Sequence, residues 1–304
     1  MGDIMKPIRS YRIYIWGLFC LIFIIFLITP PAAQSQDLDE IRQAGVIRHL
    51  GIPYANFVTG GGDGMDVELV KLFAAHIGVR YEYVKTDWDE AIGDLTGKLV
   101  RPKGGEIEIL AEVPVKGDLI ANGMTVIPWR QQIVNYSMPT FPNQVWLVAR
   151  SDSPINPIKP SGNLKKDIEM VKQLIRDKKL ITKANTCLDP SLYNLAATGA
   201  QIILFQGSLN EIAPALLNQE AEVTLLDVPD ALVALQKWPG KIKVIGPVSS
   251  VQDMAVAFRK DSPKLRAAFD RFLATLQKNG TLRKIALKYY PFVTDYYGTF
   301  FKTR

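Results

Sequence analysis

The sequence predicts a two-lobed α/β protein in which each lobe is a mostly parallel sheet flanked by helices. Short apolar stretches typical of buried strands alternate with amphipathic helical patterns, and this alternation occurs twice along the chain. Glycine-rich or polar loops follow several of the strands, as they do where a ligand site is built. With 304 residues, the chain is also long for one compact domain.

The first 35 residues are predicted to lie outside the fold. A basic start with Lys6, Arg9 and Arg12 runs into an apolar stretch over 13–29, and Pro30 and small residues follow it, which is the pattern of an export signal. The apolar stretch is also close to the minimum length of a membrane-spanning helix. Two outcomes therefore stay open: a soluble periplasmic protein after cleavage, or a protein tethered to the inner membrane by residues 13–29.

The elements of the first segment follow in chain order. Residues 38–45 predict a short helix, and 46–51 predict a buried strand that leads into the loop 52–64. Asp66 is expected to cap a helix whose apolar side chains share one face and which ends at Gly78. The next expected elements are a strand over 80–84, a short helix over 88–95, an inserted surface hairpin over 101–115, a strand over 117–121, a helical turn over 128–132 and a strand over 145–149.

The second segment repeats the alternation. Ser208 and Glu211 form a capping-box pattern for a helix over 209–218. A strand over 222–226 then delivers Asp227 at its C-terminal end, where ligands bind in open α/β sheets. The other expected elements are helices over 164–177 and 190–197, strands over 180–184, 201–205 and 241–245, and an apolar stretch over 254–258 that crosses back to the first lobe.

The end of the chain predicts two helices. Ser262 and Pro263 open the first, and Asn279 and Gly280 close it. Thr281 is expected to cap the second, which runs to Tyr290. The first lobe is therefore assigned to 36–147 plus 258–304 and the second to 148–257, with two crossovers that would form a hinge.

Three stretches resemble a known family. They are Gly64-Met65-Asp66-Val67-Glu68-Leu69, then Asp118-Leu119-Ile120-Ala121-Asn122-Gly123-Met124-Thr125 followed by Arg130, and the segment from Asp270 to Tyr290. On these motifs the chain resembles the type II periplasmic solute-binding proteins of family 3, which serve amino-acid transporters. The resemblance implies a two-lobed fold that closes around a small polar ligand, with delivery to the permease of an ABC transporter.

The resemblance also implies a set of ligand-binding residues. In this family an arginine after the Gly-Met-Thr turn binds the ligand's carboxylate, the turn adds backbone donors, and an acid of the other lobe binds the ammonium group. The matching positions are Arg130, Gly123, Thr125 and Asp227, with Thr186 before a helix N-terminus and the aromatic residues Tyr54, Phe57 and Trp88. A guanidinium fork suits a carboxylate, which agrees with the role of Arg130.

Several of these residues also have a purely structural reading. Arg130 could be a solvated helix arginine, Asp227 is also a suitable helix cap, and an aromatic side chain is more often core than pocket. The chain departs from the family pattern at Asn185, where glycine is usual, at Ile127 and Trp129, and in the insertion at 101–115. Asn185 can still adopt a left-handed conformation.

The remaining inferences concern what the protein does not do. The formal charge of +6 is spread along the sequence, so nucleic acid is not an expected partner. Two histidines and, beyond the leader, the single cysteine Cys187 offer few ligands for a metal, and we expect no metal, no cofactor and no catalytic residue. The prediction is a monomeric binding protein, not an enzyme. The alternatives are a membrane-anchored ligand sensor and an enzyme on the same fold, either dehydratase-like or associated with peptidoglycan.

Overall fold

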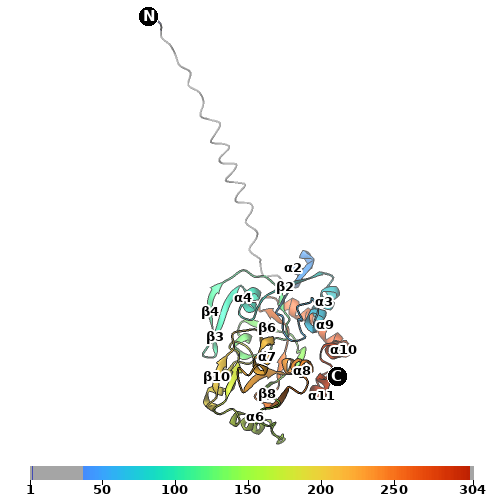
Figure 1. Cartoon of the computed structure of the whole chain (residues 1–304). Helices are drawn as coiled ribbons and strands as arrows, with labels where there is room; N and C mark the ends of the chain where they lie inside the picture. The colour runs from blue at the N-terminus through green and yellow to red at the C-terminus, as the bar shows by residue number, and fades with distance from the viewer. Residues whose placement is uncertain (1, 3–36, 302–304) are drawn as a thin grey trace. The chain divides into compact units, whose positions relative to one another are not determined.

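The computed structural model describes Gly2 and residues 37–301, and this part of the chain contains two five-stranded sheets (Figure 1). The predicted leader over 1–35, with its apolar stretch over 13–29, lies outside the described residues. Among the residues that the structure describes, no helix combines the length and the apolar character needed to cross a membrane.

The first sheet has the strand order β2-β1-β5-β14-β6. Its strands are β1 (Val46–Gly51), β2 (Arg80–Lys85), β5 (Leu119–Ile120), β6 (Val134–Tyr136) and β14 (Ala257–Arg259). β1 pairs in parallel with β2 and β5, whereas β14 is antiparallel to β5 and β6. Ile47 and Leu50 of β1 are fully buried, because apolar side chains from this central strand reach the core.

The second sheet has the order β10-β9-β11-β8-β12. Its strands are β8 (Val145–Arg150), β9 (Lys179–Thr182), β10 (Gln201–Leu204), β11 (Val223–Asp227) and β12 (Ile242–Pro247). β9 is parallel to β10 and β11, and β8 is antiparallel to β11 and β12. β8 follows the chain segment that crosses from the first sheet to the second, and β14 follows the segment that crosses back. Each of these two strands is antiparallel to its neighbours. The predicted two-lobed α/β fold is confirmed.

Two short strands connect the sheets. β7 (Phe141–Asn143) lies in the chain between β6 and β8, and β13 (Gln252–Met254) lies between β12 and β14. They pair with each other in antiparallel register, with Asn143 opposite Gln252 and Phe141 opposite Met254. The two crossings that the sequence predicted therefore form one ladder between the lobes.

Most helices of the first-lobe segments lie in the upper half of the described body in Figure 1, whereas the last one lies lower, near the C-terminus. They are α2 (Leu38–Ala44), α3 (Met65–Ile77), α4 (Ala91–Thr96), α5 (Pro128–Gln131), α9 (Pro263–Lys278), α10 (Thr281–Tyr289) and α11 (Val293–Tyr297). Phe73 of α3 packs edge-on against Phe269 of α9, with ring centroids 5.0 Å apart. These two helices therefore share a core, and burying one phenylalanine side chain there contributes about 1.5–3 kcal/mol to stability.

Three details of these helices differ from the sequence prediction. Asp66 is not the cap of α3, because the helix begins at Met65 and Gly64 occupies the cap position. Gly64 has φ 133°, and a Cβ there would lie 2.2 Å from the carbonyl oxygen of Phe57. Thr281 is likewise the first residue of α10 and not its cap. Trp88 precedes α4 instead of belonging to it.

Helices of the second lobe are shorter than predicted. They are α6 (Leu164–Gln173), α7 (Ile212–Leu217), α8 (Val228–Lys237) and the 3-10 helices η1 (Pro190–Tyr193), η2 (Leu195–Thr198) and η3 (Leu209–Glu211). The helix expected over 190–197 is interrupted because Asn194 adopts a left-handed conformation with φ 53°. The capping box of Ser208 and Glu211 is confirmed.

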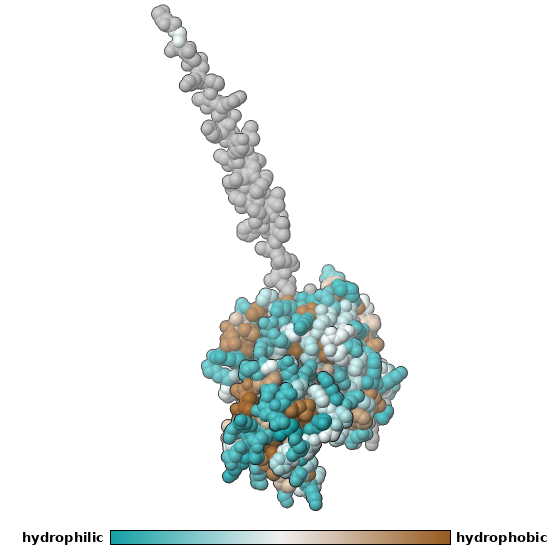
Figure 2. Space-filling view, viewed as in Figure 1, coloured by the Kyte–Doolittle hydropathy of each residue, from teal (hydrophilic) through white to brown (hydrophobic). Residues whose placement is uncertain are grey.

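The inserted surface hairpin is also confirmed. It consists of β3 (Lys98–Lys103) and β4 (Glu106–Glu112), and ion pairs from Arg101 and Lys103 to Glu108 connect its strands at 2.7 and 2.9 Å. Ile109 and Leu110 are 54% and 47% exposed, and Figure 2 shows an apolar patch over this part of the molecule.

Candidate functional site

Several of the predicted site residues meet where the two lobes face each other. The hydroxyl of Tyr54, in the loop after β1, donates a hydrogen bond to Oδ1 of Asp227 at the end of β11. Nη2 of Arg130, on α5, donates to the carbonyl oxygen of Asn185 at 3.0 Å. First-lobe side chains therefore bind second-lobe groups at two points. A third contact joins Ala55 N to Oδ1 of Asn210 at 2.9 Å.

Arg130 is buried, with a relative exposure of 2%. Its Nη1 donates to the carbonyl oxygen of Thr125 at 3.2 Å, while its Nε has no hydrogen-bond partner among the described residues. The guanidinium carbon lies 5.5 Å from the ring centroid of Trp88 and 5.3 Å from that of Trp129, which allows cation–π contacts. Its hydrogen bonds within residues 37–301 go to neutral carbonyl groups, so an anion would offset its charge.

Asp227 provides the matching acid. It caps α8 by accepting a hydrogen bond from Asp230 N at 3.3 Å, and its Oδ2 accepts one from the Cys187 thiol at 3.3 Å. Burial raises the pKa of Asp227, and the hydrogen bonds from Tyr54 and Cys187 offset this in part. The prediction that Asp227 caps a helix is therefore confirmed. The same side chain also faces the first lobe, where it accepts the hydrogen bond from Tyr54.

Asp230 adds a second buried carboxyl beside Asp227. Burial and the neighbouring charge of Asp227 raise the pKa of Asp230 well above its usual range. Its Oδ2 has no hydrogen-bond partner among the described residues. Two neighbouring buried acids disfavour each other's ionised forms, which favours the neutral form of Asp230.

The Gly-Met-Thr turn is held on two sides. Gly123 N donates to Oδ2 of Asp66 at 2.7 Å, and Oγ1 of Thr125 accepts a hydrogen bond from Nδ2 of Asn143 at 3.1 Å. Gly123 has φ 67°, and a Cβ there would lie 2.3 Å from the ring of Phe57. The position therefore requires glycine for both its backbone conformation and its packing. The turn is anchored to α3 on one side and to β7 on the other.

The second-lobe loop contains Asn185, Thr186 and Cys187. Asn185 adopts a left-handed conformation with φ 62°, as its residue type allows. Thr186 is buried, and its Oγ1 donates to the carbonyl oxygen of Lys183 at 2.9 Å and accepts from Leu188 N at 3.1 Å. Burial and the charge of Asp227 raise the pKa of the Cys187 thiol well above its usual range. The thiol is therefore protonated, which makes it a poor nucleophile.

The three aromatic candidates lie in different surroundings. The ring centroids of Tyr54 and Trp88 are 5.7 Å apart, so both belong to the cluster around Arg130 and Asp227. Phe57 is fully buried and packs against Phe141 and Tyr290, with centroids 5.2 Å away in each case. Phe57 thus supports the Gly123 turn from the core side.

The sequence prediction did not identify four contributors to this cluster. Trp129 flanks the guanidinium of Arg130, and the carbonyl group of Asn185 accepts its hydrogen bond. Asn143 and Asp66 hold the Gly-Met-Thr turn. Asp66 stands in a quoted motif, but its partner Gly123 is 57 positions away in the chain. No local pattern could have predicted such a contact.

The buried histidine of the described chain, His49, lies outside this cluster. His49 Nε2 lies 2.6 Å from the carbonyl oxygen of Ala121 and its Nδ1 lies 2.9 Å from the hydroxyl of Tyr81, so this imidazole is engaged within the first lobe. Burial lowers the pKa of His49 to about 4. Over 37–301 no group of His, Cys, Asp or Glu side chains is arranged to hold a metal ion.

A groove of 720 Å³ borders the site at Tyr193, whose hydroxyl donates to the carbonyl oxygen of Cys187.

The chain is similar in sequence to a transglycosylase and to a periplasmic binding protein. The chain is 26% identical over 270 residues to the membrane-bound lytic murein transglycosylase F of Desulfosudis oleivorans, covering 86% of this chain and 52% of that protein. It is 23% identical over 261 residues to the octopine-binding periplasmic protein of Rhizobium meliloti, covering 81% of each. The chain thus spans about half the length of the transglycosylase and most of the binding protein.

A solved structure gives the same picture of the fold. An ancestral arginine-binding protein bound to arginine superimposes with a TM-score of 0.64 at 21% identity, covering 81% of this chain and 98% of that one. The family model of the bacterial extracellular solute-binding proteins, family 3, matches residues 114–292, which include the Gly-Met-Thr turn, Arg130, Asp227 and both crossings between the lobes. The chain therefore belongs to the bacterial extracellular solute-binding proteins of family 3.

Proposed function

We propose that this protein captures a small zwitterion, an amino acid or a close derivative, between its two lobes and performs no reaction on it. The observation that carries the proposal is a pair of buried, oppositely charged groups at the lobe interface: the Arg130 guanidinium, whose partners are neutral carbonyl groups, and the Asp227 carboxyl. A carboxylate at Arg130 and an ammonium group at Asp227 would compensate both charges.

The surrounding residues would shape the bound ligand. Trp88 and Tyr54 would cover it from the first lobe, Thr125 and Gly123 would position Arg130 through the turn, and Thr186 would hold the second-lobe loop. Phe57 supports the turn from beneath. Because burial and the charge of Asp227 favour the neutral form of Asp230, the site sets one guanidinium against one carboxylate, which matches a ligand with one carboxylate and one ammonium group.

Closure would take place about the β7–β13 ladder, through which the chain passes twice between the sheets. The borders of the lobes would then fall at or beside this ladder, a few residues from the borders expected at 147 and 258. A ligand that contacts both lobes binds the closed form more tightly and shifts the equilibrium towards it. The expected partner is an ABC transporter permease. A monomeric, periplasmic form of this protein would deliver the bound ligand to it.

An enzymatic role is the second candidate, since the chain is similar to part of a lytic transglycosylase. The described site residues favour binding. A nucleophilic Cys187 would need a base that takes its proton. The thiol donates its hydrogen bond to the carboxyl of Asp227, and the raised pKa of the thiol opposes ionisation. We therefore propose that the site binds its ligand unchanged.

A thermal-shift screen of the purified protein against cationic, neutral and acidic amino acids tests this function. A ligand that binds only the folded state raises the melting temperature, by an amount corresponding to about 2.7 kcal/mol at a hundred times its Kd. We expect the largest saturable shift with neutral amino acids, whose single carboxylate and single ammonium group match Arg130 and Asp227.

Arg130→Ala should weaken ligand binding by roughly 30-fold or more, because truncating one partner of a buried charge pair costs about 2–5 kcal/mol. Arg80→Ala is the matched control, since Arg80 is 67% exposed on β2 and pairs with Glu82 at 3.3 Å. Equal affinity of the two variants would refute the role of Arg130. Absence of a shift with every zwitterion would refute the proposed function itself.

A further inference from the structure

Three consecutive residues of the first lobe, Pro53, Tyr54 and Ala55, form three hydrogen bonds to the second lobe, and we call them the clasp segment. The Tyr54 hydroxyl donates to Oδ1 of Asp227. On either side of Tyr54 the backbone binds one side chain, because Ala55 N donates to Oδ1 of Asn210 at 2.9 Å and Nδ2 of Asn210 donates to the carbonyl oxygen of Pro53 at 3.3 Å. The carboxamide therefore pairs with the clasp segment as a peptide group of a neighbouring strand would.

The clasp segment is fixed to the first lobe independently of these contacts. Tyr54 N donates to the carbonyl oxygen of Val58 at 3.0 Å. The residue that follows the segment, Asn56, binds the end of α10: its Nδ2 donates to the carbonyl oxygen of Tyr289 at 2.7 Å, and its N donates to the hydroxyl of Tyr290 at 2.9 Å. Because these bonds lie within one lobe, the segment needs little further ordering when the lobes approach each other.

A rigid turn of the second lobe carries Asn210. This residue is the middle one of η3, and its neighbour Leu209 is buried with a relative exposure of 3%. Ser208 N donates to Oε2 of Glu211 at 2.6 Å, which belongs to the capping box of this turn. Asn210 itself is exposed, so a substitution there removes the contact with the clasp segment and leaves the core of the second lobe intact.

The backbone of the clasp segment is also unusual. Ala55 has φ 44°, in the left-handed region that residues other than glycine rarely adopt. Such conformations persist where surrounding contacts over-determine them, and they cluster at ligand clamps and switch regions. In Ala55 the amide group of this disfavoured conformation is the one that binds Asn210.

From these contacts we infer that Asn210 is a positioning residue of the interlobe site. Its carboxamide binds the backbone on both sides of Tyr54, holds the Tyr54 hydroxyl at Asp227 and keeps the lobes closed. It acts through Tyr54 and through closure. The role of Asn210 in retaining a ligand rests on the proposed function, whereas its role in lobe closure does not.

Double electron–electron resonance on the full chain without ligand tests the closure. Nitroxide labels are attached to ketone-bearing residues introduced in place of Lys85 and Gln206, which leaves the cysteines unmodified. Lys85 ends β2 and Gln206 follows β10, so both exposed positions lie at the edges of the sheets where the lobes face each other. Asn210→Ala should raise the ratio of long to short distances by about tenfold, because two hydrogen bonds are lost.

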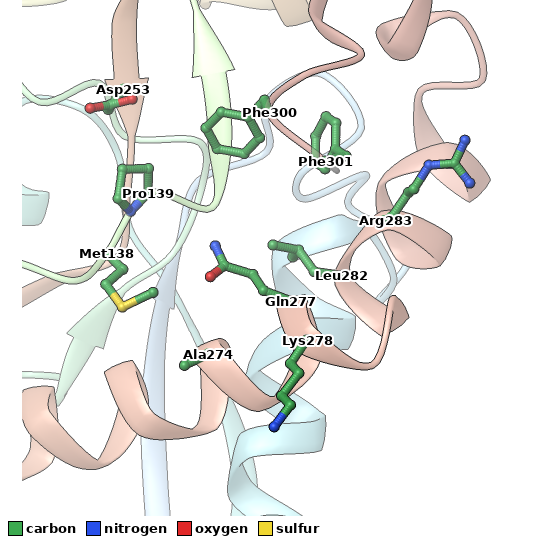
Figure 3. A pocket seen from close by; sticks show the side chains of 10 residues that line it. All are labelled: Met138, Pro139, Asp253, Ala274, Gln277, Lys278, Leu282, Arg283, Phe300 and Phe301. Carbon is green, nitrogen blue, oxygen red and sulfur yellow. The ribbon is translucent and has the colours of Figure 1, made fainter. Parts of the chain in front are cut away.

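Three further variants make this measurement specific. Asn210→Asp keeps an acceptor for Ala55 N but loses the donor to the carbonyl oxygen of Pro53, so its ratio should lie between those of the parent and Asn210→Ala. Asn218→Ala, at an exposed asparagine beyond the far end of α7, should leave the distances unchanged. Gln277→Ala should also leave them unchanged, because this carboxamide lines a cavity of 470 Å³ that shares no residue with the clasp segment (Figure 3).

Stopped-flow kinetics with the best ligand of the thermal-shift screen tests retention. Since the ligand enters the open form and closure retains it, Asn210→Ala should raise the dissociation rate by about tenfold with little change in the association rate. The melting temperature without ligand should stay close to that of the parent. Distances that do not change in Asn210→Ala would overturn the inference even if a zwitterion binds. Changed distances without binding of any zwitterion would support the closure and refute the proposed function instead.

Discussion

Two buried carboxyl groups of this protein, Asp66 and Asp227, show how similar chemistry can have different consequences. Each is 1% exposed, and burial raises the pKa of both. The partner of Asp66 is Gly123 N, which belongs to the same lobe. Asp227 accepts a hydrogen bond from Tyr54 of the other lobe and one from Cys187 of its own.

The difference lies in what happens when the lobes separate. Asp66 keeps its hydrogen bond, because α3 and the Gly123 turn belong to one core. Asp227 would lose Tyr54 and would need another donor, which a ligand can provide. Burial of an acid therefore does not by itself identify a binding site, whereas donors from two separable bodies do. The predictions below test this contrast.

The largest expected effect is the pH dependence that Asp66 confers on stability. Burial raises the pKa of Asp66 to about 7, whereas an unfolded aspartate titrates near about 4. Between these values the folded state binds a proton that the unfolded chain has lost, so the contribution of Asp66 to stability decreases as the pH rises from about 4 to 7. At about 1.4 kcal/mol per pH unit, the loss could reach about 4 kcal/mol.

His49 acts in the opposite direction. Its folded pKa is lowered to about 4, below the unfolded value of about 6.5, so its contribution to stability decreases as the pH falls through this window. Urea unfolding at pH 5 and pH 7.5 separates the two groups when wild type is compared with Asp66→Asn. As the pH rises from 5 to 7.5, the free energy of unfolding of Asp66→Asn should increase by about 2–3 kcal/mol relative to that of the wild type. Parallel pH profiles would contradict the assignment to Asp66.

Gly123→Ala tests the support of the turn. The substitution forces a side chain into a left-handed conformation and into the ring of Phe57, 2.3 Å away. We expect the free energy of unfolding to fall by about 2–4 kcal/mol, from strain and overpacking together. Gly104→Ala is the control, because Gly104 has φ 61° with no atom within 4 Å of the added Cβ, and should cost about 1 kcal/mol. Equal costs for the two variants would show that Phe57 does not constrain the turn.

Asp227→Asn tests the other carboxyl and has the smallest expected energy. Loss of a charge-assisted hydrogen bond to the ligand should weaken binding by about 10- to 150-fold, or about 1.5–3 kcal/mol. Asp66→Asn should change affinity by about threefold or less, since its amide oxygen can still accept the hydrogen bond from Gly123 N. Calorimetric titration with the best ligand of the thermal-shift screen measures both. Similar losses in the two variants would remove the proposed distinction between these acids.

The order of elements was predictable because its signals are local. β1 begins and ends where the apolar pattern predicted, and the Ser208–Glu211 capping box joins residues three positions apart. The hairpin of β3 and β4 was likewise visible as alternation around a glycine turn. In each case the interacting groups lie within a few residues, so the chain conformation itself determines the contact.

Predictions that depended on neighbours distant in sequence were less complete. Asp66 had every local feature of a helix cap, yet the close approach of the Phe57 backbone requires glycine at 64, and the carboxyl turns to Gly123 instead. α11 was not predicted at all. Tyr296 of this helix packs against Trp146 of the second sheet, with ring centroids 5.5 Å apart, which is a contact between chain segments 150 positions apart.

The sequence by itself determined the α/β alternation, the two crossings, and the residue types of the candidate site: a guanidinium after the Gly-Met-Thr turn and an acid at the end of a strand. Only the tertiary structure decided that Tyr54 and Trp88 join this cluster while Phe57 packs behind it, and that Trp129 flanks Arg130. The physical reason is that propensity and periodicity act along the chain, whereas the bond from Tyr54 to Asp227 spans 173 positions and forms only when two lobes have packed and approached.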